Sequence, residues 1–195
     1  MILHLDSIHQ IGQYGRTSHK GSSSSSCGND TEIPLAYFIS FRSYGTWLHG
    51  DRRGSIDRFH NRYGDPYLPS NKGQQRYNCK RLKTDPFILG ARARRSVAKA
   101  IRETCHIRRW YLQALNVRTN HVHTVVTADC EPSLVLNALK ANATRQLRRD
   151  QLWCYSFSPW ADKGSKRRLW NERSVANAVN YVMNGQGDDL PDFDE

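Results

Sequence analysis

Hydrophobic and polar positions along this chain follow two periods, and each period predicts one kind of element. Residues 35–47, "LAYFISFRSYGTW", are rich in aromatic and β-branched side chains, which is typical of a strand. Residues 111–117 and 121–127 continue the pattern as two further strands joined by "RTN". A shorter signal at 168–170 indicates a fourth strand.

Three other segments carry apolar residues about every four positions, which is the period of an amphipathic helix. The first covers 85–110, with Asp85 as the expected N-cap and Pro86 at the first helical position. The second covers 131–150 and the third covers 172–187. The order of these elements predicts an α+β fold, a ferredoxin-like βαββαβ sandwich with an added C-terminal helix.

The segments around this pattern suggest how the chain is divided. Residues 1–31 end in "GSSSSSCGND", a composition typical of a disordered N-terminal arm. Residues 32–186 are expected to form one domain, interrupted at 48–84 by an irregular insertion rich in glycine, proline and charge. Residues 187–195 form an acidic tail.

Charge narrows the classes of partner. The chain has 29 Lys and Arg against 18 Asp and Glu, a net charge of +11, which is typical of a polyanion binder. A solvated basic helix face without a partner is the alternative. Five scattered cysteines without a CxxC pair argue against a disulfide framework or a zinc ribbon. No run approaches 18 apolar residues, so we expect a cytoplasmic protein that does not enter a membrane.

Two histidines stand one residue apart in the stretch "TNHVHTVV". Because side chains alternate faces along a strand, His121 and His123 share one face, about 7 Å apart by strand rise. Neutral imidazoles so placed can share a metal ion. Two ordinary sheet-surface histidines remain the alternative, since so short a motif also occurs by chance.

Tyr181 lies on the flank of the last helix's apolar stripe. With Val175 set at zero, steps of 100° place Tyr181 at about 240°, beside Asn177 and Asn184. A tyrosine that serves only the core would lie within the stripe, although a tyrosine at a helix edge with its hydroxyl in water is the alternative.

The motifs "VRTNHVHTVV", "WADKGSKRRLW" and "NYVMNGQG" together resemble the single-tyrosine HUH transposases of bacteria. These are the small transposases of insertion sequences and the REP-associated tyrosine transposases. The stretch "YGTWLHGDRRGS" also resembles a subgroup of bacterial transposase-like proteins. The resemblance covers roughly residues 35 to 190.

The resemblance implies a metal-dependent enzyme that cuts and rejoins single-stranded DNA, and catalytic roles for Tyr181, His121 and His123. The two histidines would bind Mg²⁺ or Mn²⁺, and Tyr181 would form a 5′-phosphotyrosine intermediate. Relatives often carry the third metal ligand four residues after the tyrosine, where this chain has Gly185, so Gln186 is expected to serve if the helix ends there. Single-stranded DNA with hairpins and a homodimer are the implied partners.

Basic and aromatic residues near these motifs are candidates for DNA contacts. They are Arg42, Tyr44, Trp47, Arg92, Arg95, Arg118, Lys166 and Arg167.

Two competing functions remain open from the sequence. A ferredoxin-like sheet with basic helices is also the plan of modules that bind single-stranded nucleic acids. A catalytically weakened transposase acting as a hairpin binder or repressor belongs to this class. A metal-dependent hydrolase that uses water, with Tyr181 incidental, is the third possibility.

Overall fold

The structure is a computed structural model, and it describes residues 33–55, 66 and 68–191. The predicted arm, 1–31, lies outside the described residues, as does the end of the predicted tail. The helices and strands are β1 (Ala36–Arg42), α1 (Lys72–Lys80), α2 (Ala91–Ile107), β2 (Tyr111–Val117), β3 (His121–Thr127), α3 (Pro132–Arg149), β4 (Ser165–Leu169) and α4 (Glu172–Asn184). No described helix is both long and apolar enough to cross a membrane.

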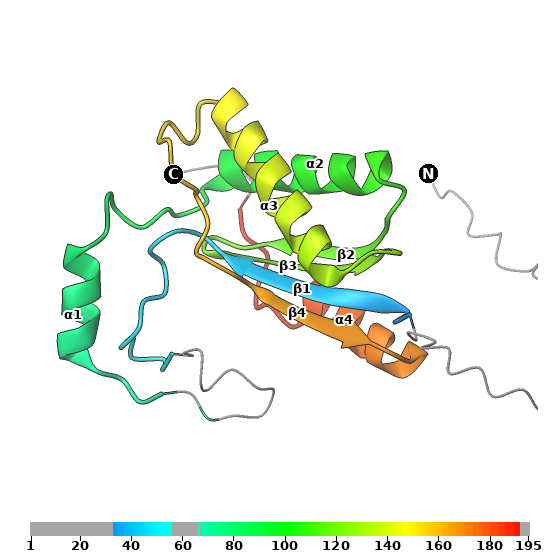
Figure 1. The fold of residues 1–195 in the computed structure, drawn as a ribbon, viewed down its shortest axis with the longest axis horizontal. Helices are drawn as coiled ribbons and strands as arrows, with labels where there is room; N and C mark the ends of the chain where they lie inside the picture. The colour runs from blue at the N-terminus through cyan, green and yellow to red at the C-terminus, as the bar shows by residue number, and fades with distance from the viewer. Residues whose placement is uncertain (1–32, 56–65, 67, 192–195) are drawn as a thin grey trace, which may run out of the picture. The chain divides into compact units, whose positions relative to one another are not determined.

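One antiparallel sheet organises the fold, with the strand order β2-β3-β1-β4 (Figure 1). β1 therefore lies between β3 and β4, and it pairs antiparallel with both. This order and connectivity are those of the predicted ferredoxin-like sandwich with an added C-terminal helix, so the fold prediction is confirmed. The fourth strand begins three residues earlier than expected and ends at Leu169.

Helices cover the two faces of the sheet unequally. α2 and α3 lie together on one face, where the main core includes Tyr37, Ile39 and Phe41 of β1. α4 lies on the other face and contributes buried Ala178 and Val182 to a smaller apolar cluster. Because a single short helix cannot cover this face, the side chains of β1 and β3 beyond its edge stay partly accessible.

The predicted start of the long helix was wrong. α2 begins at Ala91 after Gly90, and neither Asp85 nor Pro86 caps it. The preceding segment is extended because its backbone is held by other loops: Phe87 N donates to the Tyr44 carbonyl, and Leu89 N donates to the Thr119 carbonyl. Tertiary hydrogen bonds thus override a local capping signal.

The insertion 48–84 is less irregular than predicted because it contains α1. This helix has no buried residue, so it lacks the apolar stripe by which the sequence would reveal it. Its N-cap is Asn71, whose side chain accepts a hydrogen bond from Gln74 N at 3.0 Å. Residues 56–65 of the insertion lie outside the described residues.

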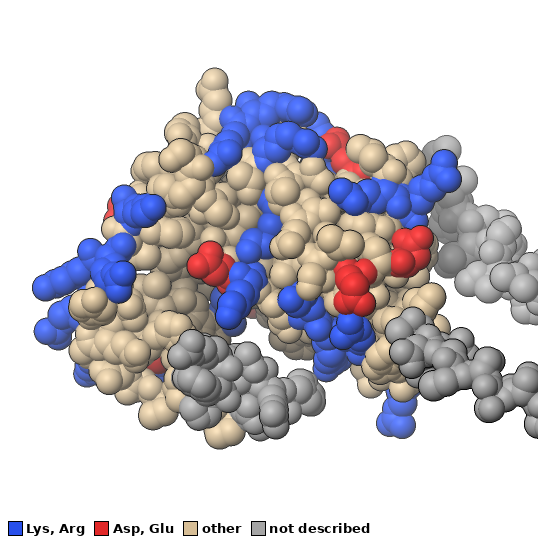
Figure 2. Space-filling view, in the orientation of Figure 1, with Lys and Arg blue, Asp and Glu red and all other residues tan. Residues whose placement is uncertain are grey.

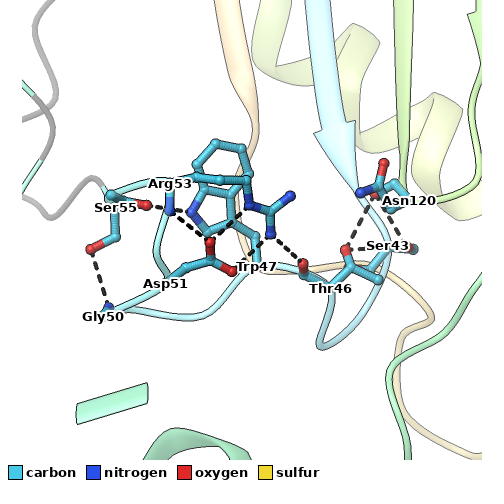
Figure 3. Close-up of polar contacts among 9 residues, drawn as sticks. Ser43, Thr46, Trp47, Gly50, Asp51, Arg53, Ser55 and Asn120 are labelled. Atoms are coloured by element: carbon cyan, nitrogen blue, oxygen red, sulfur yellow. Dashed lines mark hydrogen bonds and ion pairs between the residues drawn. The ribbon is translucent and has the colours of Figure 1, made fainter. Parts of the chain in front are cut away.

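The loop after β1 is held by a buried carboxylate (Figure 3). Asp51 is 7% exposed and accepts hydrogen bonds at 2.8 Å from both Nε and Nη2 of Arg53. The Arg53 guanidinium lies 4.5 Å from the centre of the Trp47 ring, and Trp47 Nε1 donates to the Gly54 carbonyl. The Asp51–Arg53 pair therefore fixes the indole of Trp47 within the loop.

The Asp51–Arg53 pair predicts a pH-dependent contribution to stability. Hydrogen bonding to Arg53 lowers the pKa of Asp51 to about 2, and Arg52 acts in the same direction. The unfolded chain therefore takes up a proton first as the pH falls, so the stabilisation is complete above pH ~5 and is lost toward pH ~2. We expect Asp51→Asn to lower the free energy of unfolding by about 1–2 kcal/mol at pH 7.

Urea unfolding of the wild type and Asp51→Asn at several pH values measures this difference. It should stay constant from pH 7 to pH 5 and shrink below pH 4. Asp129→Asn, which changes an exposed carboxylate, is the matched control. If the difference in free energy of unfolding between the wild type and Asp51→Asn does not change with pH, the charge of Asp51 does not contribute to its interaction with Arg53.

Gly164 allows β4 to approach β1 closely. A Cβ built at this position would lie 2.8 Å from the Ser40 carbonyl oxygen and 3.0 Å from Leu136 Cδ2. We therefore expect Gly164→Ala to destabilise the protein by about 1–3 kcal/mol in urea unfolding. Gly73→Ala is the control, because its Cβ would meet only the Asn71 side chain at 3.4 Å. Equal stability of the two variants would contradict the packing of Gly164.

Candidate active site

The pairing register of β1 and β3 brings four polar side chains to one face of the sheet. Ser40 pairs with His123, and Arg42 pairs with His121. All four share the parity of Ala36 and Val125, which lie in the apolar cluster beneath α4. The two histidines therefore occupy the thinly covered face, as the alternation predicted, and their ring centres are 4.6 Å apart.

His121 is held by polar groups at both ring nitrogens. Nδ1 lies 2.6 Å from Asn120 Oδ1, and Nε2 lies 3.3 Å from Gln186 Oε1. The amide nitrogen of Gln186 is already used, because it donates to the Tyr181 carbonyl at 3.3 Å. When Nδ1 carries the proton and donates to Asn120, the lone pairs of Nε2 and Gln186 Oε1 face each other with no proton between them.

His123 is oriented by a hydroxyl and an aromatic ring. Nδ1 lies 2.6 Å from Ser40 Oγ. The imidazole also stacks on Phe38, with ring centres 5.4 Å apart and planes 21° apart. Ser40 Oγ can accept a hydrogen bond from the Nδ1–H group, which leaves Nε2 of His123 as an electron-pair donor.

Both imidazoles favour the neutral form. Burial lowers the pKa of His123 to about 4, with the neighbouring His121 and Arg42 adding to this effect. Burial also lowers the pKa of His121, where Arg42, Arg118 and Arg53 act in the same direction and Gln186 opposes them. At neutral pH both side chains are therefore in the state that binds metal ions.

These side chains fit a divalent metal ion. Within the described residues, no group of three or more His, Cys, Asp or Glu side chains could hold a metal, so a third ligand must be of another kind. The amide oxygen of Gln186 could supply one, because it faces His121 Nε2. An amide oxygen is a ligand type that suits Mg²⁺ and Mn²⁺, whereas imidazole nitrogens are more usual ligands of other transition metals, so phosphate oxygens would have to complete the shell of either ion.

The end of α4 positions Gln186. Asn171 is the N-cap of this helix, and its side chain accepts a hydrogen bond from Ser174 N at 2.9 Å. The helix ends at Asn184, and Gly185 N closes the last turn on the Tyr181 carbonyl at 2.9 Å. Because the helix stops there, the next side chain folds back toward β3 and reaches His121.

Tyr181 lies beside the histidines within the same chain. Its ring centre is 5.7 Å from that of His123 and 5.9 Å from that of Phe38, with edge contacts to both. The residue is 48% exposed, so it does not belong to the core, and the short ring distance places it next to His123. A Cβ at Gly185 would lie 2.8 Å from Tyr181 Cδ2, so the absence of a side chain at 185 makes room for this ring.

The residues predicted to contact DNA lie in several parts of the structure, and some of them lie close to the histidines. Arg42 and Arg167 lie on the same face as the histidines, with the Arg42 guanidinium 3.2 Å from the centre of the Trp47 ring and that of Arg167 5.6 Å from the centre of the Phe38 ring. Tyr44 packs against Phe157 at 5.1 Å, so part of its ring is already covered.

Of the remaining predicted contacts, Arg118 lies beside His121, because its backbone N donates to the His121 carbonyl at 2.8 Å, and the other three lie on the α2 and α3 side of the sheet. Arg118 donates to the Asp188 carbonyl at 2.8 Å, so the residues after α4 already contact it. Arg92 and Arg95 are exposed on α2, in the layer on the opposite face of the sheet. Lys166 donates to Ser133 on α3 at 3.2 Å.

Sequence reasoning missed three residues that shape the site: Phe38, Ser40 and Asn120. Phe38 and Ser40 have the same parity as Arg42 along β1, so strand alternation alone would place them on one face. Their contact with the histidines depends on the register of β1 against β3, which the sequence does not reveal.

Comparison with known proteins gives a family match. The family model for IS200-like transposases matches residues 81–182, slightly more than half of the 195-residue chain. This range includes His121, His123 and Tyr181. No curated protein sequence matches the chain.

Two solved structures resemble the chain at low identity. One is a REP-associated tyrosine transposase bound to a REP hairpin, which is 13% identical to this chain with a TM-score of 0.44. The match covers 83% of this chain and 72% of that one. The other is a candidate transposase from Deinococcus radiodurans R1, with 14% identity, 82% and 97% covered, and a TM-score of 0.41.

The contacts at the two Nδ1 atoms predict a measurable effect on metal affinity. We expect Ser40→Ala and Asn120→Ala each to weaken Mn²⁺ binding by about 10-fold or more, because each imidazole loses the group that fixes its tautomer. Isothermal titration measures the affinity, and ¹⁵N NMR of the imidazoles reports the tautomers. Ser165→Ala is the control, since Ser165 is an exposed serine of β4 that pairs with Ser40 of β1. Unchanged tautomers and affinity in both site variants would contradict this role.

Proposed function

The chain belongs to the IS200-like transposase family and its function is transposase-like, and from this premise we propose that it cuts and rejoins single-stranded DNA through Tyr181. The observation that carries the proposal is the placement of the Tyr181 ring 5.7 Å from His123 within one chain. A phenol and a pair of half-buried, neutral imidazoles thus lie side by side at one edge of the face that α4 covers.

Each side chain has a definite part in this proposal. His121, His123 and Gln186 would hold Mg²⁺ or Mn²⁺, which when bound supplies positive charge that polarises the scissile phosphate. Arg42 adds a fixed cation beside His121 and can bind a phosphate oxygen. Phe38 holds the rings of Tyr181 and His123 at a fixed separation.

The chemical step transfers a phosphoryl group from one oxygen to another. The phenol oxygen of Tyr181 loses its proton and attacks phosphorus. The bond from phosphorus to the 3′ oxygen breaks, and this oxygen takes up a proton to become a free 3′-hydroxyl. Attack by the same or another 3′-hydroxyl on the phosphotyrosine reverses the step, so the strand is rejoined without an external energy source.

The substrate would be a single strand whose folded part is a hairpin. The surface carries Lys and Arg side chains over α2, α3 and α1, with a few acidic side chains among them (Figure 2). Such a surface favours a polyanion without reading its sequence. A homodimer remains part of the proposal, although one chain already brings Tyr181 to its own His123.

A labelled hairpin-bearing single strand incubated with Mn²⁺ and resolved on a denaturing gel tests the proposal. The wild type should give a covalent protein–DNA adduct, and Tyr181→Phe should reduce it by at least about a thousandfold because the nucleophile is absent. Tyr111→Phe, which alters a tyrosine exposed on β2, should leave the adduct unchanged.

Two other outcomes would contradict the proposal. A gel-mobility shift under native conditions without any adduct would indicate a binding module or repressor. Cleavage that survives Tyr181→Phe would indicate hydrolysis by water, with Tyr181 incidental.

A further inference from the structure

A hollow of about 590 Å³ adjoins the candidate active site. Three segments form it: the loop that follows β1, the residues that follow α1, and the connection from α3 to β4. Arg42 belongs both to its lining and to the strand pair that carries the site, because Arg42 pairs with His121. A strand of nucleic acid at His121 would therefore pass the mouth of this hollow.

Aromatic rings form much of the lining. Phe157 is partly exposed, and its ring contacts Tyr44 at 5.1 Å and Tyr155 at 5.2 Å. Trp160 is buried and contacts Phe41 at 4.9 Å. The Tyr44 hydroxyl accepts a hydrogen bond from Lys83 N at 2.9 Å, which ties the segment after α1 to the loop after β1. Two of the three segments that line the hollow are therefore joined by a direct hydrogen bond.

Cations line the same hollow. Arg81 and Lys83 are exposed, and Lys83 Nζ lies 5.5 Å from the centre of the Phe157 ring. Asp162 is the only acidic residue in the lining, which consists of described residues. Apolar π-faces and positive charge therefore occur together, which suits a planar ring that carries a phosphate.

The size and position of the hollow restrict its occupant. A volume of 590 Å³ lies in the range of small-molecule sites and cannot admit a nucleic-acid duplex. A base within a duplex also has its two faces stacked on its neighbours, so only an unpaired base can present a face to Phe157. Among polyanions, this combination favours a single strand.

We propose that this hollow binds one or two unpaired nucleotides of the strand that runs through the active site, with a base against Phe157 and its phosphate between Arg81 and Lys83. The inference rests on the proposed function for the identity of the strand. The lining residues from Arg42 to Ser55 precede the range matched by the family model, so this part of the site lies outside that match. The hollow would give the enzyme a preference for the bases that flank the cleavage position.

An abasic scan tests the proposal with full-length protein. Tyr181→Phe protein is used so that no strand is cut, and its binding to hairpin-bearing strands with one abasic nucleotide at successive unpaired positions is measured by fluorescence anisotropy. We expect one or two adjacent positions at which base removal weakens binding by about tenfold. At these positions, 2-aminopurine should be quenched on binding, because it stacks on an aromatic ring.

A protein variant links that position to the hollow. Adding Arg81→Ala and Lys83→Ala to Tyr181→Phe should abolish the dependence on position and reduce the salt dependence of single-strand binding. Arg76→Ala and Lys80→Ala remove two exposed cations from α1 that do not line the hollow, and they should preserve the dependence on position.

Three results would overturn the proposal. Base removal could leave binding unchanged at every position, or the position dependence could persist in the Arg81→Ala and Lys83→Ala variant. The Arg76→Ala and Lys80→Ala control could also lose the position dependence. Tighter binding of RNA of the same sequence would also overturn the assignment to DNA. The gel assay for the adduct is independent of these measurements. If no adduct forms but the dependence on position is found, the proposed function fails and the nucleotide site stands. If the adduct forms but binding does not depend on the position of the missing base, the proposed function stands and only the nucleotide site is removed.

Discussion

The site depends above all on the register in which β1 pairs with β3. Because Ser40 lies opposite His123 and Arg42 opposite His121, one face of the sheet gathers two imidazoles, a hydroxyl and a guanidinium. A shift of one residue would turn all the side chains of β1 to the opposite face and place Tyr37, Ile39 and Phe41 under α4. The register is fixed by the opposite face of the sheet, because Tyr37, Ile39 and Phe41 are buried there in the core beneath α2 and α3. The packing of the core thus determines the geometry of the polar face.

The second constraint is the way in which α4 covers that face. Ala178 and Val182 pack on the sheet, whereas Tyr181 lies off this contact and meets Phe38 and His123 at its edge. Gly185 ends the helix and leaves room for the Tyr181 ring, and Gln186 then turns back to His121. In the proposed function, the nucleophile and the third metal ligand would therefore come from one helix end, one before and one after Gly185. The same face remains open where β1 ends, and there the loop held by Asp51 and Arg53 begins the wall of the adjoining hollow.

Much of the fold was predictable because strands and helices with a buried face carry their period in the sequence. The four strands and the three helices that pack on the sheet were found in this way, and alternation placed His121 and His123 on one face. α1 was missed because a helix without a buried residue has no apolar stripe. The start of α2 was misplaced because Phe87 and Leu89 are held by distant carbonyl groups. Ser40, Asn120 and Phe38 could not be assigned to the site, since their contacts with the imidazoles are set by the pairing of strands far apart in the chain.

The most direct test of the central claim is electron spin-echo spectroscopy of Mn²⁺ added to the protein. The account predicts that the spectrum shows coupling to two imidazole nitrogens, that His121→Ala and His123→Ala each remove one of them, and that Gln186→Ala weakens Mn²⁺ binding while both couplings remain. A spectrum without any directly bound nitrogen, or one unchanged by either histidine substitution, would contradict a metal site built on the paired imidazoles of β3.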